Sequence, residues 1–76
     1  MKLYSQDTFS ARLKQARKRN GVTQQDLAAE ADLGVTTVAG FEQATRMPTV
    51  ISLCKLAGAL GVTADWLLGL EAKSER

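Results

Sequence analysis

Residues 24–43 read QQDLAAEADLGVTTVAGFEQ, and the rest of the chain can be interpreted as a scaffold for this stretch. Its apolar residues recur at helical spacing in two separate groups. The first group is Leu27, Ala28 and Ala31, and the second group is Val38 and Phe41. Leu33 lies between the two groups, where we expect a tight turn. The pattern predicts a short helix, a turn and a second short helix.

Only one register of this unit agrees with the side chains. The fifth residue of the unit is Ala28, whose small side chain lets two helices cross closely. The ninth is Asp32, where the turn needs a positive φ that Asp tolerates better than most non-glycine residues. Placing Gly34 there instead fails, because Glu30 would occupy the crossing and Gly40 the core. The stretch is therefore predicted to be a helix-turn-helix, a unit typical of DNA-binding proteins.

The flanking segments are also helical in pattern. A first helix begins at an N-cap that is either Asp7 or Thr8 and carries an apolar stripe at i, i+4, i+7. It ends at Gly21, which is expected to be left-handed. The stripe of this helix is Phe9, Leu13 and Ala16. Thr23 opens the next helix with Asp26 three residues on, a variant of the capping box.

Later threonines mark further helix starts, at Thr49 and Thr63. The helices expected after the first one cover residues 24–31, 35–43, 50–60 and 64–68. The fourth helix has a longer apolar stripe, which consists of Val50, Leu53, Leu56, Ala57 and Leu60. Residues 70–76 are polar and are expected to fray. The fold class predicted is all-α, a compact five-helix bundle in one domain over residues 1–76.

Composition limits the classes of protein that fit. The chain has 76 residues, 45% of them hydrophobic and 24% charged, as in ordinary globular domains. Its single cysteine, Cys54, excludes an internal disulfide and is expected to be a small buried hydrophobe. There is no histidine and no metal-ligand set, so we expect no metal and no cofactor. No run of apolar residues suits a membrane span or a signal peptide, which together with the unpaired cysteine favours a reducing cytoplasm.

Charge is distributed unevenly, although the net charge is only +2. Residues 1–22 carry six basic side chains and one acidic one, whereas residues 23–48 carry one basic and four acidic. Residues 49–76 are balanced. A uniformly basic surface, typical of proteins that bind nucleic acid without regard to sequence, is therefore excluded. Attraction for phosphates has to be local.

Taken together, these segments resemble the helix-turn-helix domain of lambdoid phage repressors and Cro proteins. The resemblance covers residues 9–69 and rests on several motifs in the same order. They are RLKQARKRNG in the first helix, TQQDLA at the start of the second, FE at the end of the third, RMP before the fourth, and LAGALGVTADWLLG at the end. It implies a lambda-repressor-like fold that binds double-stranded DNA without a small-molecule ligand or a membrane.

The resemblance also implies roles for individual residues. Arg17 is expected to pair with Glu42, tying the first helix to the third, and to be able to face a phosphate as well. Phosphate contacts are implied for Thr23, Gln24, Gln43, Thr45 and Arg46. Residues that reach base edges in the family correspond to Val35, Thr36, Thr37, Ala39 and Gly40. This set departs from the family pattern, because it has no Arg, Asn or Gln and offers mainly methyl groups for thymine.

A two-fold contact is implied near the fifth helix, where phage repressor domains meet on an operator. Its apolar candidates are Ile51, Leu68 and Leu70; the alternative is that they form the edge of the core. Trp66 is expected in the core itself. A dimer would hold two recognition helices about 34 Å apart, one turn of DNA.

The function predicted is that of a sequence-specific DNA-binding transcriptional regulator, in particular a repressor acting as a homodimer on a pseudo-palindromic operator. The alternative is a protein-interaction or antitoxin-like module that pairs with another helix-turn-helix regulator and binds DNA weakly. An enzyme is not expected, because the sequence has no nucleophile with a base, no metal set and no glycine-rich phosphate loop.

Overall fold

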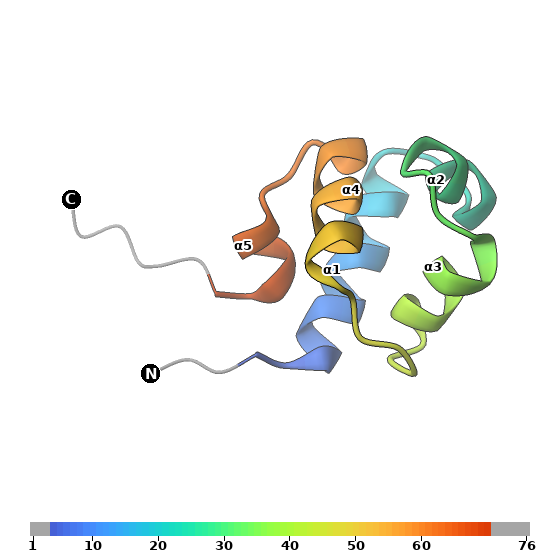
Figure 1. Ribbon diagram of the computed structural model, residues 1–76. Helices are drawn as coiled ribbons and strands as arrows, with labels where there is room; N and C mark the ends of the chain where they lie inside the picture. The colour runs from blue at the N-terminus through green and yellow to red at the C-terminus, as the bar shows by residue number, and fades with distance from the viewer. Residues whose placement is uncertain (1–3, 71–76) are drawn as a thin grey trace.

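Helices make up all the regular secondary structure in residues 4–70, the part of the chain that the computed structural model describes. The helices are α1 (Gln6–Arg19), α2 (Gln24–Glu30), α3 (Val35–Glu42), α4 (Val50–Leu60) and α5 (Ala64–Leu68). The all-α prediction is confirmed, and from α2 onward each end lies within one residue of its predicted position. Figure 1 shows α2 and α3 together at one end of the molecule, α5 at the other, and α1 between them.

Within the described part, no helix is long and apolar enough to cross a bilayer. The expected frayed tail, residues 70–76, lies outside the described residues apart from Leu70.

Side-chain oxygens cap the starts of four of the helices. The Thr23 hydroxyl accepts a hydrogen bond from the Asp26 amide at 3.0 Å, and the Asp26 carboxylate accepts one from the Thr23 amide at 3.3 Å, so the predicted capping box is present. Thr49 and Thr63 cap α4 and α5 as predicted. The cap of α1 was predicted wrongly: it is Ser5, whose Oγ accepts from the Thr8 amide at 3.3 Å.

Each of the five described helices is followed, within two residues of its end, by a residue with positive φ. These residues are Gly21, Asp32, Ala44, Gly61 and Gly69. At Asp32 φ is 56°, as the register required, and the following amide of Leu33 donates to the Ala28 carbonyl at 2.8 Å. Ala44, with φ 62°, has a methyl side chain in the left-handed region, a conformation that costs about 1–2 kcal/mol for most residues.

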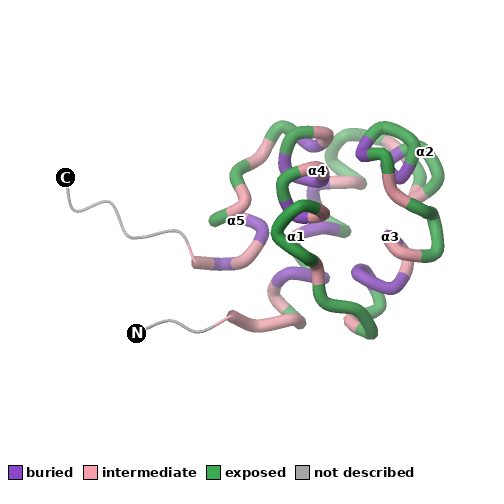
Figure 2. Tube along the Cα trace, in the orientation of Figure 1, coloured by how far each residue is buried: buried purple, intermediate pink, exposed green. Residues whose placement is uncertain are grey.

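A single apolar core joins the helices. It consists of Phe9, Leu13, Ala16, Leu27, Ala28, Ala31, Val38, Phe41, Leu53, Leu56, Ala57, Leu60 and Leu67. Val50 was wrongly included in the α4 stripe, since it is 76% exposed. Cys54 was wrongly predicted to be buried; it is exposed, because it follows Leu53 by one residue and so points away from the stripe. Figure 2 shows the exposed segment that runs from the α3–α4 loop into the first turn of α4.

Trp66 lies at the edge of this core rather than inside it. Its half-buried ring packs against the core and lies under two guanidinium groups of α1, with Arg12 Cζ at 5.1 Å and Arg19 Cζ at 5.8 Å from the ring centroid. Arg12 also donates to the Trp66 carbonyl at 2.6 Å. Two of the basic residues of α1 are thus engaged with α5, on the side away from α3.

Candidate nucleic-acid interface

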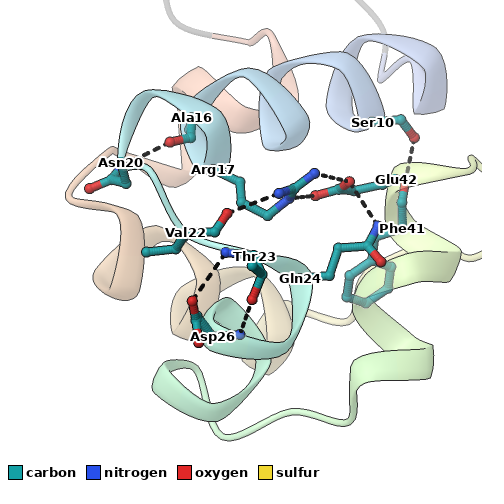
Figure 3. A network of polar contacts seen from close by, with 10 residues as sticks. All are labelled: Ser10, Ala16, Arg17, Asn20, Val22, Thr23, Gln24, Asp26, Phe41 and Glu42. Carbon is teal, nitrogen blue, oxygen red and sulfur yellow. Dashed lines mark hydrogen bonds and ion pairs between the residues drawn. The ribbon is translucent and has the colours of Figure 1, made fainter.

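The inner side of α3 is attached to α1 by packing and by a buried hydrogen bond. Phe41 packs edge-on against Phe9, with ring centroids 5.7 Å apart. The Ser10 hydroxyl donates to the Phe41 carbonyl at 2.5 Å, and Ser10 is buried (Figure 3). A carbonyl in the last turn of a helix, such as that of Phe41, can accept such a bond with little loss to the helix. α3 is therefore held by its side chains and by its backbone.

A buried ion pair forms the second attachment of α3. Arg17 donates from Nε to one carboxylate oxygen of Glu42 at 2.6 Å and from Nη2 to the other at 3.1 Å. The Gln24 amide also donates to Glu42, at 3.0 Å, so α1 and α2 both reach this carboxylate (Figure 3). The two charged side chains are only 14% and 3% exposed. Such a bidentate geometry fixes the orientation of the three helices.

The electrostatics of the pair agree with this geometry. Burial by itself raises the pKa of Glu42, but the hydrogen bonds from Arg17 and Gln24 and the positive charges of Arg17 and Lys14 outweigh it, so the pKa lies below its usual value. The hydrogen bond to Glu42 raises the pKa of Arg17 despite burial. Both groups therefore remain charged at neutral pH.

These contacts give Arg17 a structural role. Its third nitrogen, Nη1, donates to the Val22 carbonyl at 2.9 Å, so Nε, Nη1 and Nη2 each make one bond within the protein. Nη1 and Nη2 each have a second N–H group, and the phosphate contact expected of Arg17 stays a prediction. The Gln24 amide nitrogen likewise has two N–H groups, of which Glu42 takes one.

The outer side of α3 presents fewer free groups than the sequence suggested. Val35 is 41% exposed and Thr36 is exposed, while Thr37 and Ala39 are half-buried. Gly40, one of the residues expected to reach base edges, is buried. The aliphatic part of Arg46 lies against it: a Cβ built on Gly40 would lie 2.9 Å from Arg46 Cδ.

The candidate phosphate groups lie at two ends of the helix-turn-helix. Gln43, Thr45 and Arg46 are exposed in the loop after α3. Thr45 is held there by a hydrogen bond from its hydroxyl to the Gly40 carbonyl at 3.2 Å. At the other end, Thr23 is exposed, but its hydroxyl is used by the capping box.

The apolar dimer candidates are not all in one place. Leu68 and Leu70 line an apolar groove of ≈ 340 Å³, whereas Ile51, which is 69% exposed, is not among its lining residues. The other residues of this groove are Tyr4, Met47, Pro48, Thr49, Val50 and Leu53. Sequence reasoning missed Met47 and Val50, which are 65% and 76% exposed. An apolar residue in an otherwise polar loop was the available signal for Met47.

Within residues 4–70, no group of three or more carboxylates and cysteines is placed to hold a metal ion.

Comparison with known proteins gives consistent matches. The family model described as helix-turn-helix matches residues 13–67. The HTH-type transcriptional regulator ImmR of Bacillus subtilis (strain 168) is 34% identical over 69 residues, which are 91% of this chain and 54% of ImmR. The chain therefore spans about half the length of this curated relative.

Solved structures agree with that match. The restriction-modification controller protein C.AhdI of Aeromonas hydrophila is 31% identical, with a TM-score of 0.78 over 82% of this chain and 94% of the controller. A point mutant of the restriction-modification controller protein C.Esp1396I is 28% identical, with a TM-score of 0.77 over 92% and 89%. The hypothetical transcription factor NHTF of Neisseria is 25% identical, with a TM-score of 0.79 over 90% and 84%.

The family predicted from the motifs is confirmed, since the family model covers well over half of the sequence. The chain belongs to the Cro/C1-type helix-turn-helix family.

Proposed function

We propose that this chain is a sequence-specific, double-stranded-DNA-binding transcriptional regulator that acts as a repressor. The observation that carries the proposal is the contrast between the two sides of α3. Its inner side is fixed by Ser10, Arg17 and Gln24, while its first turn is exposed at Val35 and Thr36. A rigid helix with an exposed N-terminal turn suits insertion into a major groove. The names of the relatives, a transcriptional regulator and two controller proteins, support the same class.

Base readout in this proposal depends on methyl groups. The methyl groups of Val35, Thr36 and Thr37 can contact thymine methyl groups, Ala39 adds another methyl, and the threonine hydroxyls can bond to bases or phosphates. No guanidinium or amide on α3 is available for a bidentate base contact. Discrimination is therefore modest at each position and depends in part on how easily the DNA deforms.

Phosphate contacts in this proposal position the protein on the duplex. Arg46 is the one basic side chain among residues 23–48, and it lies beside α3. Gln43 and Thr45 flank it, and Gln24 and Thr23 lie at the start of α2. Because residues 23–48 as a whole carry four acidic side chains against one basic one, affinity arises from a few short contacts rather than from long-range attraction.

The protein acts as a homodimer on a pseudo-palindromic operator in this proposal. Exposed apolar side chains are available at Met47 and Val50, which line the groove together with Leu68 and Leu70, and at Ile51, the residue after Val50. Burial of such a surface would stabilise a pair of chains by about 25 cal/mol for each Å² of apolar area removed from water. The original dimer patch of Ile51, Leu68 and Leu70 is thereby extended to the first turn of α4.

Selection of duplexes from a random pool tests the proposal. We expect recovery of two inverted half-sites separated by one helical turn, about 34 Å centre to centre. Arg46→Ala should weaken binding to selected and random duplexes by the same factor. It should also make the slope of log affinity against log salt concentration shallower by about 1. Arg19→Ala is the matched control, because it removes the same charge from the Trp66 side of α1. No binding to any duplex at low salt would contradict the proposal.

A second candidate function is a protein-interaction module that pairs with another helix-turn-helix regulator. The exposed Met47, Val50 and Ile51 favour it, as does the absence of base-reading amides on α3. The two candidates differ in their salt dependence. Specific DNA binding must weaken steeply as salt rises, whereas apolar pairing does not.

A further inference from the structure

Gly40 occupies an unusual place on α3. Successive residues of an α-helix are about 100° apart, so residue 40 lies nearly opposite buried Val38 and about 100° from buried Phe41. Glycine in the middle of a helix costs roughly 1 kcal/mol relative to alanine. A residue on the outer side of a helix is normally exposed, yet Gly40 is buried. Something outside the helix must therefore cover it.

The Arg46 side chain is that cover. A Cβ built on Gly40 would lie 2.9 Å from Arg46 Cδ, 3.1 Å from Cγ and 3.4 Å from Cβ. The first of these distances is shorter than real carbon contacts allow, and the displaced atoms belong to the middle of the arginine stem. Only glycine at this position lets the stem of Arg46 lie flat on the outer surface of α3.

The backbone around Arg46 is fixed on both sides of this contact. The Thr45 amide and hydroxyl both bond to the Gly40 carbonyl, at 2.9 Å and 3.2 Å. The Gln6 amide side chain donates to the Arg46 carbonyl at 2.8 Å. The main chain at Arg46 is therefore held by α1 and α3, and its stem lies against Gly40, although Arg46 remains an exposed residue.

We propose that Gly40 is a positioning residue for Arg46: its missing side chain is a notch that pre-sets the Arg46 guanidinium beside the recognition helix for a DNA phosphate. The inference rests on the proposed DNA-binding function. A long side chain that is ordered before binding loses less freedom on binding. In this proposal, glycine at position 40 lowers the helix propensity of α3 but positions Arg46. Replacing it with alanine should therefore change stability and DNA affinity in different ways, which makes the proposal testable.

The test uses four proteins: wild type, Gly40→Ala, Arg46→Ala and the double variant. Each is measured for unfolding by denaturant and for affinity to a 20-base-pair duplex at several salt concentrations. In the wild-type background, Gly40→Ala is expected to weaken binding about threefold to tenfold, the effect of freeing one long side chain. The salt slope should fall toward that of Arg46→Ala. In the Arg46→Ala background, Gly40→Ala should leave affinity unchanged and should raise the unfolding midpoint more than it does in wild type.

Gly58→Ala is the matched control, because Gly58 is also inside a helix and nothing lies within 4 Å of an added Cβ. It should stabilise the fold and leave binding unchanged. Affinity losses that simply add in the double variant, or an unchanged affinity of Gly40→Ala alone, would overturn the positioning role. Equal effects of Gly40→Ala on unfolding in both backgrounds would overturn the contact itself. A wild type that binds no duplex would overturn the proposed function and the phosphate assignment with it, and the unfolding data would still report on the contact.

Discussion

Removing the Glu42 carboxylate should destabilise the protein more than any exposed substitution. Three donors converge on this group: two N–H groups of Arg17 at 2.6 Å and 3.1 Å, and the Gln24 amide at 3.0 Å. Loss of one partner of a buried pair costs about 3–5 kcal/mol, because the other charge is left buried. Arg17 keeps its bond to the Val22 carbonyl and is 14% exposed, so the lower end applies. For Glu42→Ala we expect a loss of ~3 kcal/mol, which lowers Tm by about 12–24 °C in a domain of this size.

The assay is denaturant unfolding followed by the fluorescence of Trp66, the sole tryptophan. The matched control is Arg17→Ala with Glu42→Ala, which removes both charges and should cost little more than Glu42→Ala alone. Wild-type and Glu42→Ala midpoints that coincide at neutral pH would refute the reasoning.

The difference in stability between wild type and Glu42→Ala should depend on pH. The pKa of Glu42 in the folded state lies below its usual value of 4.5. Because the unfolded chain takes up the proton first as pH falls, the stabilising contribution is complete above pH 4.5 and decreases as pH falls through the folded pKa. The difference in stability between wild type and Glu42→Ala should therefore shrink on acidification. A difference that is constant from pH 7 to about pH 3 would contradict the assigned cause.

Ala44→Gly and Gly58→Ala should each stabilise the fold by about 0.5–1 kcal/mol. The first removes the strain of a φ of 62° at an alanine, and the second raises the helix propensity inside α4. A lower Tm for either variant would contradict this. Ser10→Ala should cost about 1–2 kcal/mol in denaturant unfolding, because the Phe41 carbonyl loses a buried donor; an unchanged midpoint would show that the bond contributes nothing. Tyr4→Phe should be neutral or stabilising by up to about 1 kcal/mol, since the Tyr4 hydroxyl is buried without a hydrogen-bond partner in the described residues, and a destabilised variant would point to a partner for it.

Local rules predicted most of the fold because several of them agreed at each helix end. Thr23, Thr49 and Thr63 each follow a break in the apolar pattern and each became an N-cap. At the start of α1 three neighbouring residues could all cap, and Ser5 was overlooked in favour of Asp7 and Thr8. Choice among adjacent caps depends on tertiary contacts, which a sequence pattern does not contain.

Errors in burial had two physical causes. Val50 continues the spacing of the α4 stripe, but it lies in the first turn, beyond the part of α4 that the core covers. Cys54 was predicted from the usual burial of its residue type, although its position relative to Leu53 already indicated an exposed side. Helical periodicity therefore indicated the exposure of Cys54 correctly and the burial of Val50 wrongly.

The candidate site was predictable in position more than in detail. The resemblance to phage repressors and Cro proteins implied that Arg17 pairs with Glu42, and the two side chains are paired in the structure. Nothing in the sequence indicated that Arg46 lies on Gly40. Ala44, between the two, has a φ of 62°, and alanine gives no signal of positive φ, whereas glycine does.

The convergence of α1 and α2 on the last residue of α3 has a mechanical consequence for binding. A tilt or shift of α3 would separate Glu42 from Arg17 and Gln24 and would break the bond between Ser10 and the Phe41 carbonyl. In a complex formed as proposed, the protein would act as a stiff template and the duplex would make the adjustments of bend and groove width. Sequences would then be ranked by their elastic energy as well as by their contacts, and substitutions in flanking base pairs that no side chain touches should alter affinity.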